Sequence, residues 1–340
     1  MRSKHMKKIY IVCDFRENFP SKILDGKILF NDHPRKSSVE EIKNSYCKLG
    51  YNCEIFGGVP ELLRAIDSKR HFENCLFINM SDGLTQTYSR VQIPILCEIL
   101  GVDYSGSDPF VVALMTNKHY SKLAVKEAGF LVPEGTTVSK RNLNSVISGL
   151  DKISFPVMLK PNTEGSSVGI TLKNVCFSKD EALPLLCKLI EEFNEVEMED
   201  YIPGYEITNF LIGNPGNIVL NEVLGVKHHE KILFDREVIT LMDNANKSTS
   251  YYMADQFFEK KVIEKIKSTT EEIAKTIGVK DILRIDYRLT EEQELYFLEI
   301  NSVPRVSSTS EIGFICQERN ISYENILKQY VDAIERRIYK

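Results

Sequence analysis

The chain has 340 residues, 43% of them apolar and 27% charged, which is an ordinary balance for a globular protein with two or three packed lobes. The formal net charge is −5 and no Lys/Arg-rich run stands out, which argues against nucleic acid as the main partner. No apolar run approaches the roughly 18 residues that span a bilayer, so no membrane partner is expected.

The start of the chain and the cysteines predict a cytoplasmic protein. The first residues are polar without a signal-peptide pattern, and residues 1–5 look like an expression remnant ahead of Met6. The eight cysteines form no CxxC pair and mostly lie in apolar segments, so we expect buried or half-buried thiols in a reducing compartment. A structural zinc site or a catalytic thiol is the alternative.

Strands and helices alternate through the first hundred residues. Strands are predicted at 7–13, 51–56 and 75–80, and helices at 38–49, from Pro60 onward and at 89–100. Ser38 and Glu41 are expected to form a capping box at the first helix. This alternation predicts a small parallel α/β unit that ends near the turn 104–109.

A helix at 116–129 and a strand at 155–159 each bring a lysine to a place suited to phosphate. Lys118 lies in the first turn of the helix, where a bound anion or simple solvation would explain it. Lys160 follows the strand and precedes a small-residue loop, in which Gly165 and Gly169 allow N–H groups to point inward as an anion nest. A tight loop without a ligand is the alternative.

The next segments predict a helix at 181–193, strands over 196–224, a long polar stretch at 228–254 and an amphipathic helix at 257–277. The strand 198–208 carries Glu199 and Glu206, which suit an adenine edge and a ribose, although a plain edge strand explains them equally well. A polar stretch as long as 228–254 is typical of a lid or binding loop.

A hairpin at 282–301 is the most informative segment, and a helix follows from about residue 323. Pairing its strands about the polar loop 291–294 places Asp286 opposite Glu299 and Arg284 opposite Asn301. Facing carboxylates repel, and Asp, Glu and Asn oxygens suit Mg²⁺ or Mn²⁺. The same register sets Leu289 opposite Tyr296 and gives an apolar second face: Leu283, Ile285, Tyr287, Leu289, Tyr296, Leu298 and Ile300. A solvated hairpin face is the alternative to a metal site.

Five motifs occur in the order known from D-alanine–D-alanine ligases: Lys118, FPVMLKPNTEGSSVGI (155–170), EDYIPGYEIT (199–208), LRIDY (283–287) and LEINSVP (298–304). The chain therefore resembles that branch of the ATP-grasp superfamily, well over residues 95–335 and weakly before them. The resemblance implies an α/β, ATP-grasp fold of three α/β domains with an N-terminal parallel sheet. The expected limits are 1–105, 106–195 with the phosphate loop, and 196–340 with the metal site and lid.

The resemblance also implies a role for each matching residue. Lys118 and Lys160 would contact ATP phosphates, Glu206 the ribose, and Arg284 the acyl phosphate and oxyanion. Asp286, Glu299 and Asn301 would hold two Mg²⁺ (or Mn²⁺) ions, and Ser310 would bind the second substrate's carboxylate. The catalytic candidates are completed by Ser167 and Arg305. The other ATP contacts would be the loop residues Glu164, Gly165, Ser166, Ser167 and Val168, and the adenine-side residues Glu199, Asp200, Tyr201 and Ile202.

The implied activity is ATP-dependent ligation of a small carboxylate and an amine through an acyl phosphate, with a homodimer as the family's habit. The substrate-facing parts depart from the family: Cys13–Glu17 replaces its first turn, Asn79–Gly83 its HG…GEDG stretch, and Pro304-Arg305 its Pro-Gly. Ile239 and Thr240 fall where the lid carries a Lys-Tyr pair. These departures predict substrates other than or beyond D-alanine. A true D-alanine–D-alanine ligase, a phosphotransferase on the same ATP site and a regulatory nucleotide-binding protein are the alternatives.

Overall fold

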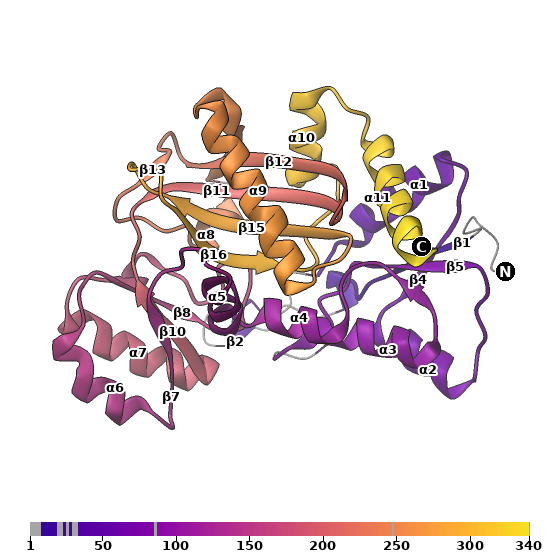
Figure 1. Cartoon of the computed structure of the whole chain (residues 1–340). Helices are drawn as coiled ribbons and strands as arrows, with labels where there is room; N and C mark the ends of the chain where they lie inside the picture. The colour runs from indigo at the N-terminus through magenta and orange to yellow at the C-terminus, as the bar shows by residue number, and fades with distance from the viewer. Residues whose placement is uncertain are drawn as a thin grey trace.

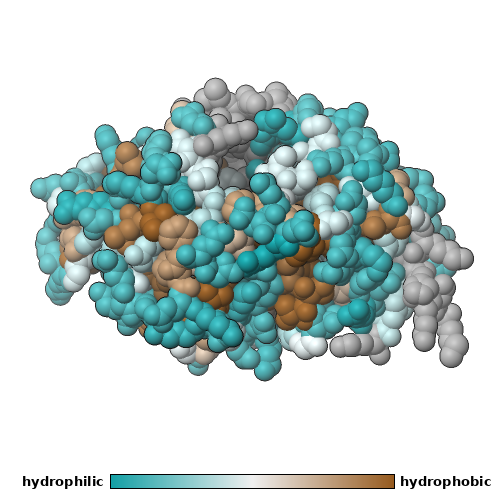
Figure 2. Space-filling model, turned by 90° about the horizontal axis from the view of Figure 1, so that it is seen from above, coloured by the Kyte–Doolittle hydropathy of each residue, from teal (hydrophilic) through white to brown (hydrophobic). Residues whose placement is uncertain are grey.

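The computed structural model describes residues 8–18, 23–24, 27–28, 33–84, 87–246 and 248–339. The expectation about residues 1–5 lies outside these ranges. No helix in the described ranges is long and apolar enough to cross a membrane. Seen from above, the surface is mostly hydrophilic and is interrupted by hydrophobic patches (Figure 2).

The N-terminal part is a parallel sheet covered on both faces, as the alternation predicted. Its strand order is β4 (Asn52–Gly57), β1 (Lys8–Val12), β5 (Cys75–Asn79) and β6 (Asp103–Tyr104). Helix α1 (Lys36–Lys48) packs on one face, and α2 (Val59–Asp67) and α3 (Gln92–Leu100) pack on the other. Coverage on both faces explains why β1 and β5 read as continuous apolar runs. The short strands β2 (Ile23–Leu24) and β3 (Lys27–Ile28) form a separate hairpin.

The predicted capping box at Ser38 is wrong. Helix α1 begins two residues earlier, with Arg35 as its N-cap, and no side chain caps it. Ser38 therefore lies inside the first turn, and the Glu41 carboxylate instead accepts a hydrogen bond from Ser308 Oγ. The spacing of Ser38 and Glu41 alone suggested a capping box, but Glu41 binds Ser308 from a distant part of the chain instead.

The predicted helix at 116–129 is confirmed as α5 (Lys118–Glu127), and a further helix that the sequence did not predict, α4 (Pro109–Thr116), precedes it. Asp108 caps α4, and Asn117 caps α5 by accepting a hydrogen bond from Tyr120 N. Asn117 is extended, which ends α4 and lets the chain turn before α5 begins. The turn expected at 104–109 therefore leads into a helix rather than closing the unit alone.

The middle of the chain forms an antiparallel sheet with the order β7 (Gly135–Ser139), β10 (Glu195–Asp200), β8 (Val157–Pro161) and β9 (Val175–Cys176). Helices α6 (Leu143–Gly149) and α7 (Lys179–Phe193) accompany it, at the lower left of Figure 1. The boundary predicted between residues 195 and 196 cuts β10 from this sheet. Strand β10 pairs with β7 and β8 over its whole length, so we propose a limit after Asp200 in place of the one that the resemblance implied.

The third sheet is antiparallel and runs in the order β14, β12, β11, β15, β16, with β13 beside β11. Helix α9 (Lys260–Ile277) covers one face together with α4 and α5, while α10 (Glu311–Arg319) and α11 (Tyr323–Ile338) lie on the other (Figure 1). The strands are β11 (Gly204–Asn214), β12 (Asn217–His228), β13 (Leu233–Phe234), β14 (Thr249–Met253), β15 (Ile282–Leu289) and β16 (Leu295–Asn301).

The segment 228–254, which we call the lid, is more regular than its sequence predicted. It contains β13, the short helix α8 (Leu241–Asn246) and β14, which extends the third sheet. The sequence did not predict these elements because each is only two to six residues long, which is too short to show a hydrophobic period in a polar segment. Helix α10, strand β7 and helix α6 were also not predicted from the sequence.

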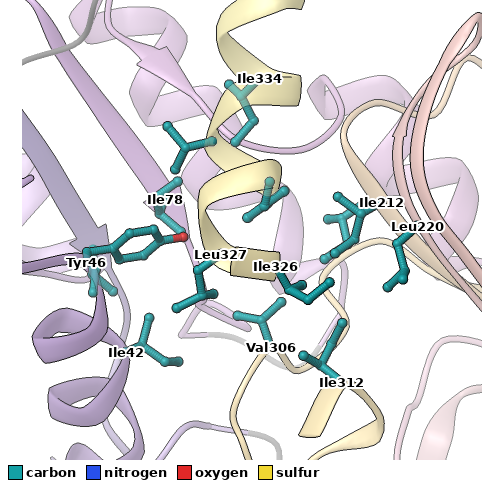
Figure 3. Close-up of a cluster of buried hydrophobic side chains, with 14 of the residues drawn as sticks. Ile42, Tyr46, Ile78, Ile212, Leu220, Val306, Ile312, Ile326, Leu327 and Ile334 are labelled. Atoms are coloured by element: carbon teal, nitrogen blue, oxygen red, sulfur yellow. The ribbon is translucent and has the colours of Figure 1, made fainter. Parts of the chain in front are cut away.

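One core joins the first and third sheets. Figure 3 shows Ile326, Leu327 and Ile334 of α11 between Ile42, Tyr46 and Ile78 on one side and Ile212 and Leu220 on the other. All these side chains are buried. Helix α11 thus fixes the N-terminal sheet against the C-terminal sheet and sets the walls of the space between them.

Candidate active site

A cavity of about 1100 Å³ opens where the three sheets meet. Its walls include residues from the N-terminal unit, the central sheet, the hairpin β15–β16 and the lid. Every residue that the sequence singled out for ATP or metal lines this cavity, and so do Arg305 and Ser310 at its other end. Segments separated by nearly 200 residues in the chain are therefore brought to one place.

Lys118 and Lys160 lie on adjoining elements, at the start of α5 and in β8. Lys118 Nζ is 3.3 Å from Glu299 Oε2 and also donates to the backbone oxygen of Glu164 in the phosphate loop. Lys160 Nζ is 2.6 Å from Glu199 Oε1. Lys118 therefore connects the phosphate loop to the hairpin, whereas Lys160 connects β8 to the adenine-side strand β10.

A third lysine at this site was missed. Lys122, one turn after Lys118 on α5, places Nζ 2.7 Å from Glu197 Oε2 and 2.6 Å from Glu199 Oε2, and all three residues are buried. Burial alone would raise the pKa of Glu197, but Lys122 and Lys160 outweigh it and hold that pKa well below its ordinary value. The i, i+4 spacing from Lys118 was the available signal, and it is common on solvated helices.

The phosphate loop has the turn geometry expected of it, but not from the residues expected. Gly169 has a positive φ of 77°, as predicted, whereas Gly165 is absent from the positive-φ residues. Ser166 (φ 48°) and Ser167 (φ 57°) adopt the left-handed conformation instead. Consecutive turns at Val168 N–Gly165 O and Ile170 N–Ser167 O, both 3.0 Å, fold the loop over the cavity. Serines in this conformation are uncommon and carry strain.

One ion pair and two hydrogen bonds to backbone oxygens organise the adenine side. Glu206 Oε2 is 3.1 Å from Arg288 Nη2, and Arg288 also donates to the oxygen of Gly204 at 3.2 Å. Tyr201 donates from its hydroxyl to the lid oxygen of Glu237 at 2.8 Å. Both carboxylate oxygens of Glu199 lie against lysines, Lys122 and Lys160, and its expected contact with adenine stays a prediction. Arg288, which the sequence reasoning missed, holds Glu206 in place.

The structure confirms the two predicted polar pairings of the hairpin. Asp286 pairs with Glu299 and Arg284 with Asn301. A β-bulge between Asp286 and Tyr287 then shifts the rest, so that Leu289 pairs with Leu295 and not with Tyr296. As a result Leu298 leaves the predicted apolar face and lines the cavity.

Cations balance the facing carboxylates. Arg284 donates to both oxygens of Asp286, at 3.1 and 2.8 Å, and Thr208 Oγ1 donates to Asp286 Oδ1 at 2.8 Å. Burial raises the pKa of Asp286, and the Arg284 charge opposes that rise without cancelling it. Burial also acts to raise the pKa of Glu299, but Lys118, Lys160 and Arg284 hold it at about 2. The Asp286, Glu299 and Asn301 oxygens form a donor set that fits a divalent cation such as Mg²⁺.

Ser310 and Arg305 lie on the loop before α10. Ser310 is the N-cap residue of α10, and its Oγ donates to the oxygens of Arg305 and Ser307 at 2.9 and 2.8 Å. Glu311, the first residue of the helix, is buried and accepts from Arg284 Nη1 at 2.9 Å and Tyr251 OH at 3.0 Å. Sequence reasoning did not find Glu311, because its role depends on the long-range approach of Arg284.

The opposite wall comes from the N-terminal unit. It includes Arg16, Asn79, Asp82 and the turn 105–107. Arg90 Nε is 2.7 Å from Asp82 Oδ1. The buried Asp14 accepts hydrogen bonds from Val59 N at the start of α2 and from Ser81 Oγ, so it fixes the wall rather than facing the cavity. Residues of the segments 79–83 and 105–107 and of the lid thus line the same cavity, and lid residues 237 and 238 lie against Tyr201 of the adenine side. That these segments form a substrate end stays a prediction.

A Gly-Ser loop, buried lysines and facing hairpin carboxylates between an open α/β unit and two antiparallel sheets define a nucleotide-dependent ligase of the ATP-grasp class. A sequence model described as "D-ala D-ala ligase C-terminus" matches residues 122–332. The chain belongs to this family and is an ATP-grasp enzyme that forms a C–N bond.

The chain is similar to D-alanine–D-alanine ligases in sequence and to ligases of this kind in structure. The D-alanine–D-alanine ligase of Fusobacterium nucleatum is 32% identical over 71% of this chain and 75% of its own length. That of Aquifex aeolicus is 27% identical over 68% of this chain and 74% of its own length. The crystal structure of the VanG D-Ala:D-Ser ligase from Enterococcus faecalis has a TM-score of 0.71 at 18% identity, covering 96% of this chain and 99% of that one, and supports the fold.

Proposed function

We propose that the enzyme activates a small carboxylate as an acyl phosphate with ATP and joins it to an amine, with amino acids other than or beyond D-alanine as substrates. The observation that carries this proposal is the meeting of Lys118, Lys160 and Arg284 with the facing Asp286 and Glu299 in one cavity. Acyl phosphate formation needs phosphate charge neutralised and a site closed to water, and these residues supply the first requirement.

The residues divide the work along the cavity. Lys118, Lys160 and the N–H groups of the 164–168 loop would hold the ATP phosphates, while Glu206 would receive the ribose. Lys118 and Lys160 now pair with Glu299 and Glu199, so phosphate binding would exchange one anion for another without leaving a buried charge unpaired.

Asp286, Glu299 and Asn301 would hold Mg²⁺, which supplies charge neutralisation and in-line orientation of the transferred phosphoryl group when bound. A substrate carboxylate oxygen attacks the γ-phosphorus and ADP leaves. The amine then attacks the acyl carbon, inorganic phosphate leaves, and the nitrogen gives up a proton. Arg284, fixed between Asp286 and Glu311, would stabilise the negative charge on the carbonyl oxygen.

Substrate choice rests on the N-terminal wall and the loop 303–310. Asp14 binds Val59 N and Ser81 Oγ and does not line the cavity. Three arginines do line it: Arg16, Arg90 and Arg305. The VanG relative shows by its name that this fold accommodates a second substrate other than D-alanine. The alternative, a D-alanine–D-alanine ligase, uses the same phosphate and metal residues and differs only at this end.

The deciding experiment measures ADP release with Mg-ATP over pairs of L- and D-amino acids and small carboxylic acids, with mass detection of the products. A pair that yields ADP and a condensed product establishes ligation and names both substrates. Efficient ADP formation with D-alanine alone would reject the proposed specificity. ADP and a stable phosphorylated acid without an acceptor would instead identify a phosphotransferase.

The metal assignment is tested with Asp286→Asn and Glu299→Gln. Each should lower turnover at least about 100-fold, since even residues behind a metal ligand cost about 10–100-fold. Glu292→Gln, in the exposed turn of the same hairpin, is the matched control and should keep full activity. Normal turnover in either cavity variant would remove the metal site from the proposal.

A further inference from the structure

A second set of ligand-type side chains lies in the lid, outside the cavity. His228, His229 and Asp243 each offer one atom, and these three atoms lie within 4.8 Å of one another. His228 Nε2 and Asp243 Oδ1 are already 2.9 Å apart. None of the three residues lines the cavity of the proposed active site.

The backbone holds this cluster from both sides. His228 ends β12, and its N–H and carbonyl pair with Lys231 at 2.9 and 3.1 Å. His229 N donates to Ser248 O at 2.9 Å, and Ser248 N donates to Asp243 O at 2.9 Å. The turn after β12 and helix α8 are therefore joined, and only side-chain rotations are needed for the three ligand atoms to converge.

The carboxylate is oriented by a neighbour, as in metal sites. Asp243 Oδ2 accepts hydrogen bonds from Thr240 N at 2.9 Å and Thr240 Oγ1 at 2.6 Å, which leaves Oδ1 directed at His228. His228 and Asp243 are mostly buried, whereas His229 is exposed and its ring lies against that of His228, with the ring centroids 4.6 Å apart. The His–Asp hydrogen bond and the ring contact together hold all three residues in one cluster.

We propose that His228, His229 and Asp243 form a site for a transition-metal dication such as Zn²⁺, with water completing its coordination. Two imidazoles and one carboxylate suit Zn²⁺ and related ions, and Mg²⁺ prefers oxygen ligands. Val238 and Ile239 line the active-site cavity, and Thr240 follows them directly. A bound ion therefore fastens the cavity-lining part of the lid to the end of β12.

Equilibrium dialysis of the full chain against Zn²⁺, with excess Mg²⁺ to occupy the oxygen-rich carboxylates of the cavity, tests the site. His229→Asn removes one imidazole and keeps the backbone, since His229 has a φ of 51° and asparagine accepts that conformation. The wild type should bind one zinc ion that the variant loses. The control His71→Asn, at an exposed histidine of the N-terminal unit, should retain it.

Two further readings separate this site from zinc held by cysteines. Thr240→Val keeps the side-chain shape but loses the hydroxyl donor to Asp243, and should weaken zinc binding about 10–100-fold. Zinc should also slow amide hydrogen exchange over 229–248 in the wild type and not in His229→Asn. The proposal is overturned if the wild type binds no zinc, or if His229→Asn binds it as tightly as the wild type does.

Discussion

Lys122 is the residue whose importance the sequence conceals most. Its ammonium group contacts two buried carboxylates, Glu197 and Glu199, and Lys160 contacts the same pair. Two lysines and two glutamates, whose charges cancel, thus form a buried cluster behind the phosphate side of the cavity. Burial lowers the pKa of Lys122 against the pull of these carboxylates, so the charge is costly and depends on its partners.

Removing that lysine should destabilise the fold strongly. Lys122→Met leaves a buried carboxylate without its cation and is expected to cost about 3–5 kcal/mol. Lys126→Met, one turn along α5, breaks only an exposed pair with Glu134 and should cost about 0–1 kcal/mol. Urea unfolding monitored by circular dichroism measures both changes. Equal losses in the two variants would show that the buried set contributes no special stability.

The same set predicts how stability responds to acid. Lys122 and Lys160 hold the pKa of Glu197 below its ordinary value of 4.5, against the rise that burial alone would cause. Between those two pKa values the unfolded chain binds more protons, so Glu197 contributes its full stability above 4.5 and loses it as the pH falls toward the folded pKa. Urea midpoints measured from about pH 6 down to about pH 3 should therefore fall more steeply for the wild type than for Glu197→Gln. Parallel curves would contradict this assignment.

At the scale of elements, the hairpin shows what alternation can and cannot predict. Alternation placed Asp286 opposite Glu299 and Arg284 opposite Asn301 correctly, because strict period-two spacing holds from 284 to 286 and from 299 to 301. It failed beyond them because the bulge adds one residue to β16. Leu298 is apolar on either face, so its identity could not reveal the change.

Helix α10 was missed because it is short, contains a glycine, and carries Phe314 on the face opposite its buried residues Ile312, Ile315 and Cys316, which weakens the apolar stripe. Gly313 is required by a close approach: a Cβ there would collide with the backbone carbonyl of Ser308. That carbonyl belongs to the loop 303–310, which borders the substrate end of the cavity. A helix glycine that looks unfavourable locally thus permits the packing of the loop over the helix.

Gly313→Ala should displace the loop and lower ligase turnover while ATP still binds. Overpacking against backbone typically costs about 1–3 kcal/mol, which exceeds the gain of about 1 kcal/mol that alanine brings to a helix. Gly149→Ala, at the end of α6 with nothing within 4 Å of its Cβ position, should leave turnover unchanged. Turnover, nucleotide binding and thermal unfolding of both variants measure this. Unchanged turnover in Gly313→Ala would show that the loop position is unimportant.

At the scale of the whole molecule, the sequence predicted the ATP and metal motifs because each is local and contiguous. It did not predict Lys122, Arg288 and Glu311, whose partners lie 75, 82 and 27 residues away. Their roles depend on which sheets and helices pack against one another, and a single sequence does not show that packing. The substrate end was predicted least because its walls come from all parts of the chain.

Helix α11 predicts which parts of the molecule unfold together. Its buried face packs between the N-terminal and C-terminal sheets, whereas the central sheet has its own core with α7 (Figures 1 and 3). Hydrogen exchange measured by mass spectrometry should therefore distinguish two equally conservative core truncations. Leu327 on α11 and Leu186 on α7 are matched, being 1% and 0% exposed.

Leu327→Ala should cost about 2–5 kcal/mol and speed amide exchange in both β1–β5 and β11–β12, although these strands are far apart in the chain. Leu186→Ala should cost a similar amount and speed exchange chiefly in β7–β10, leaving the other two sheets protected. Faster exchange in only one outer sheet after Leu327→Ala would show that the shared core does not couple them. The expected pattern would mean that the cavity has one rigid wall, formed by two sheets held by α11, and one independently moving wall that carries Lys160 and the phosphate loop.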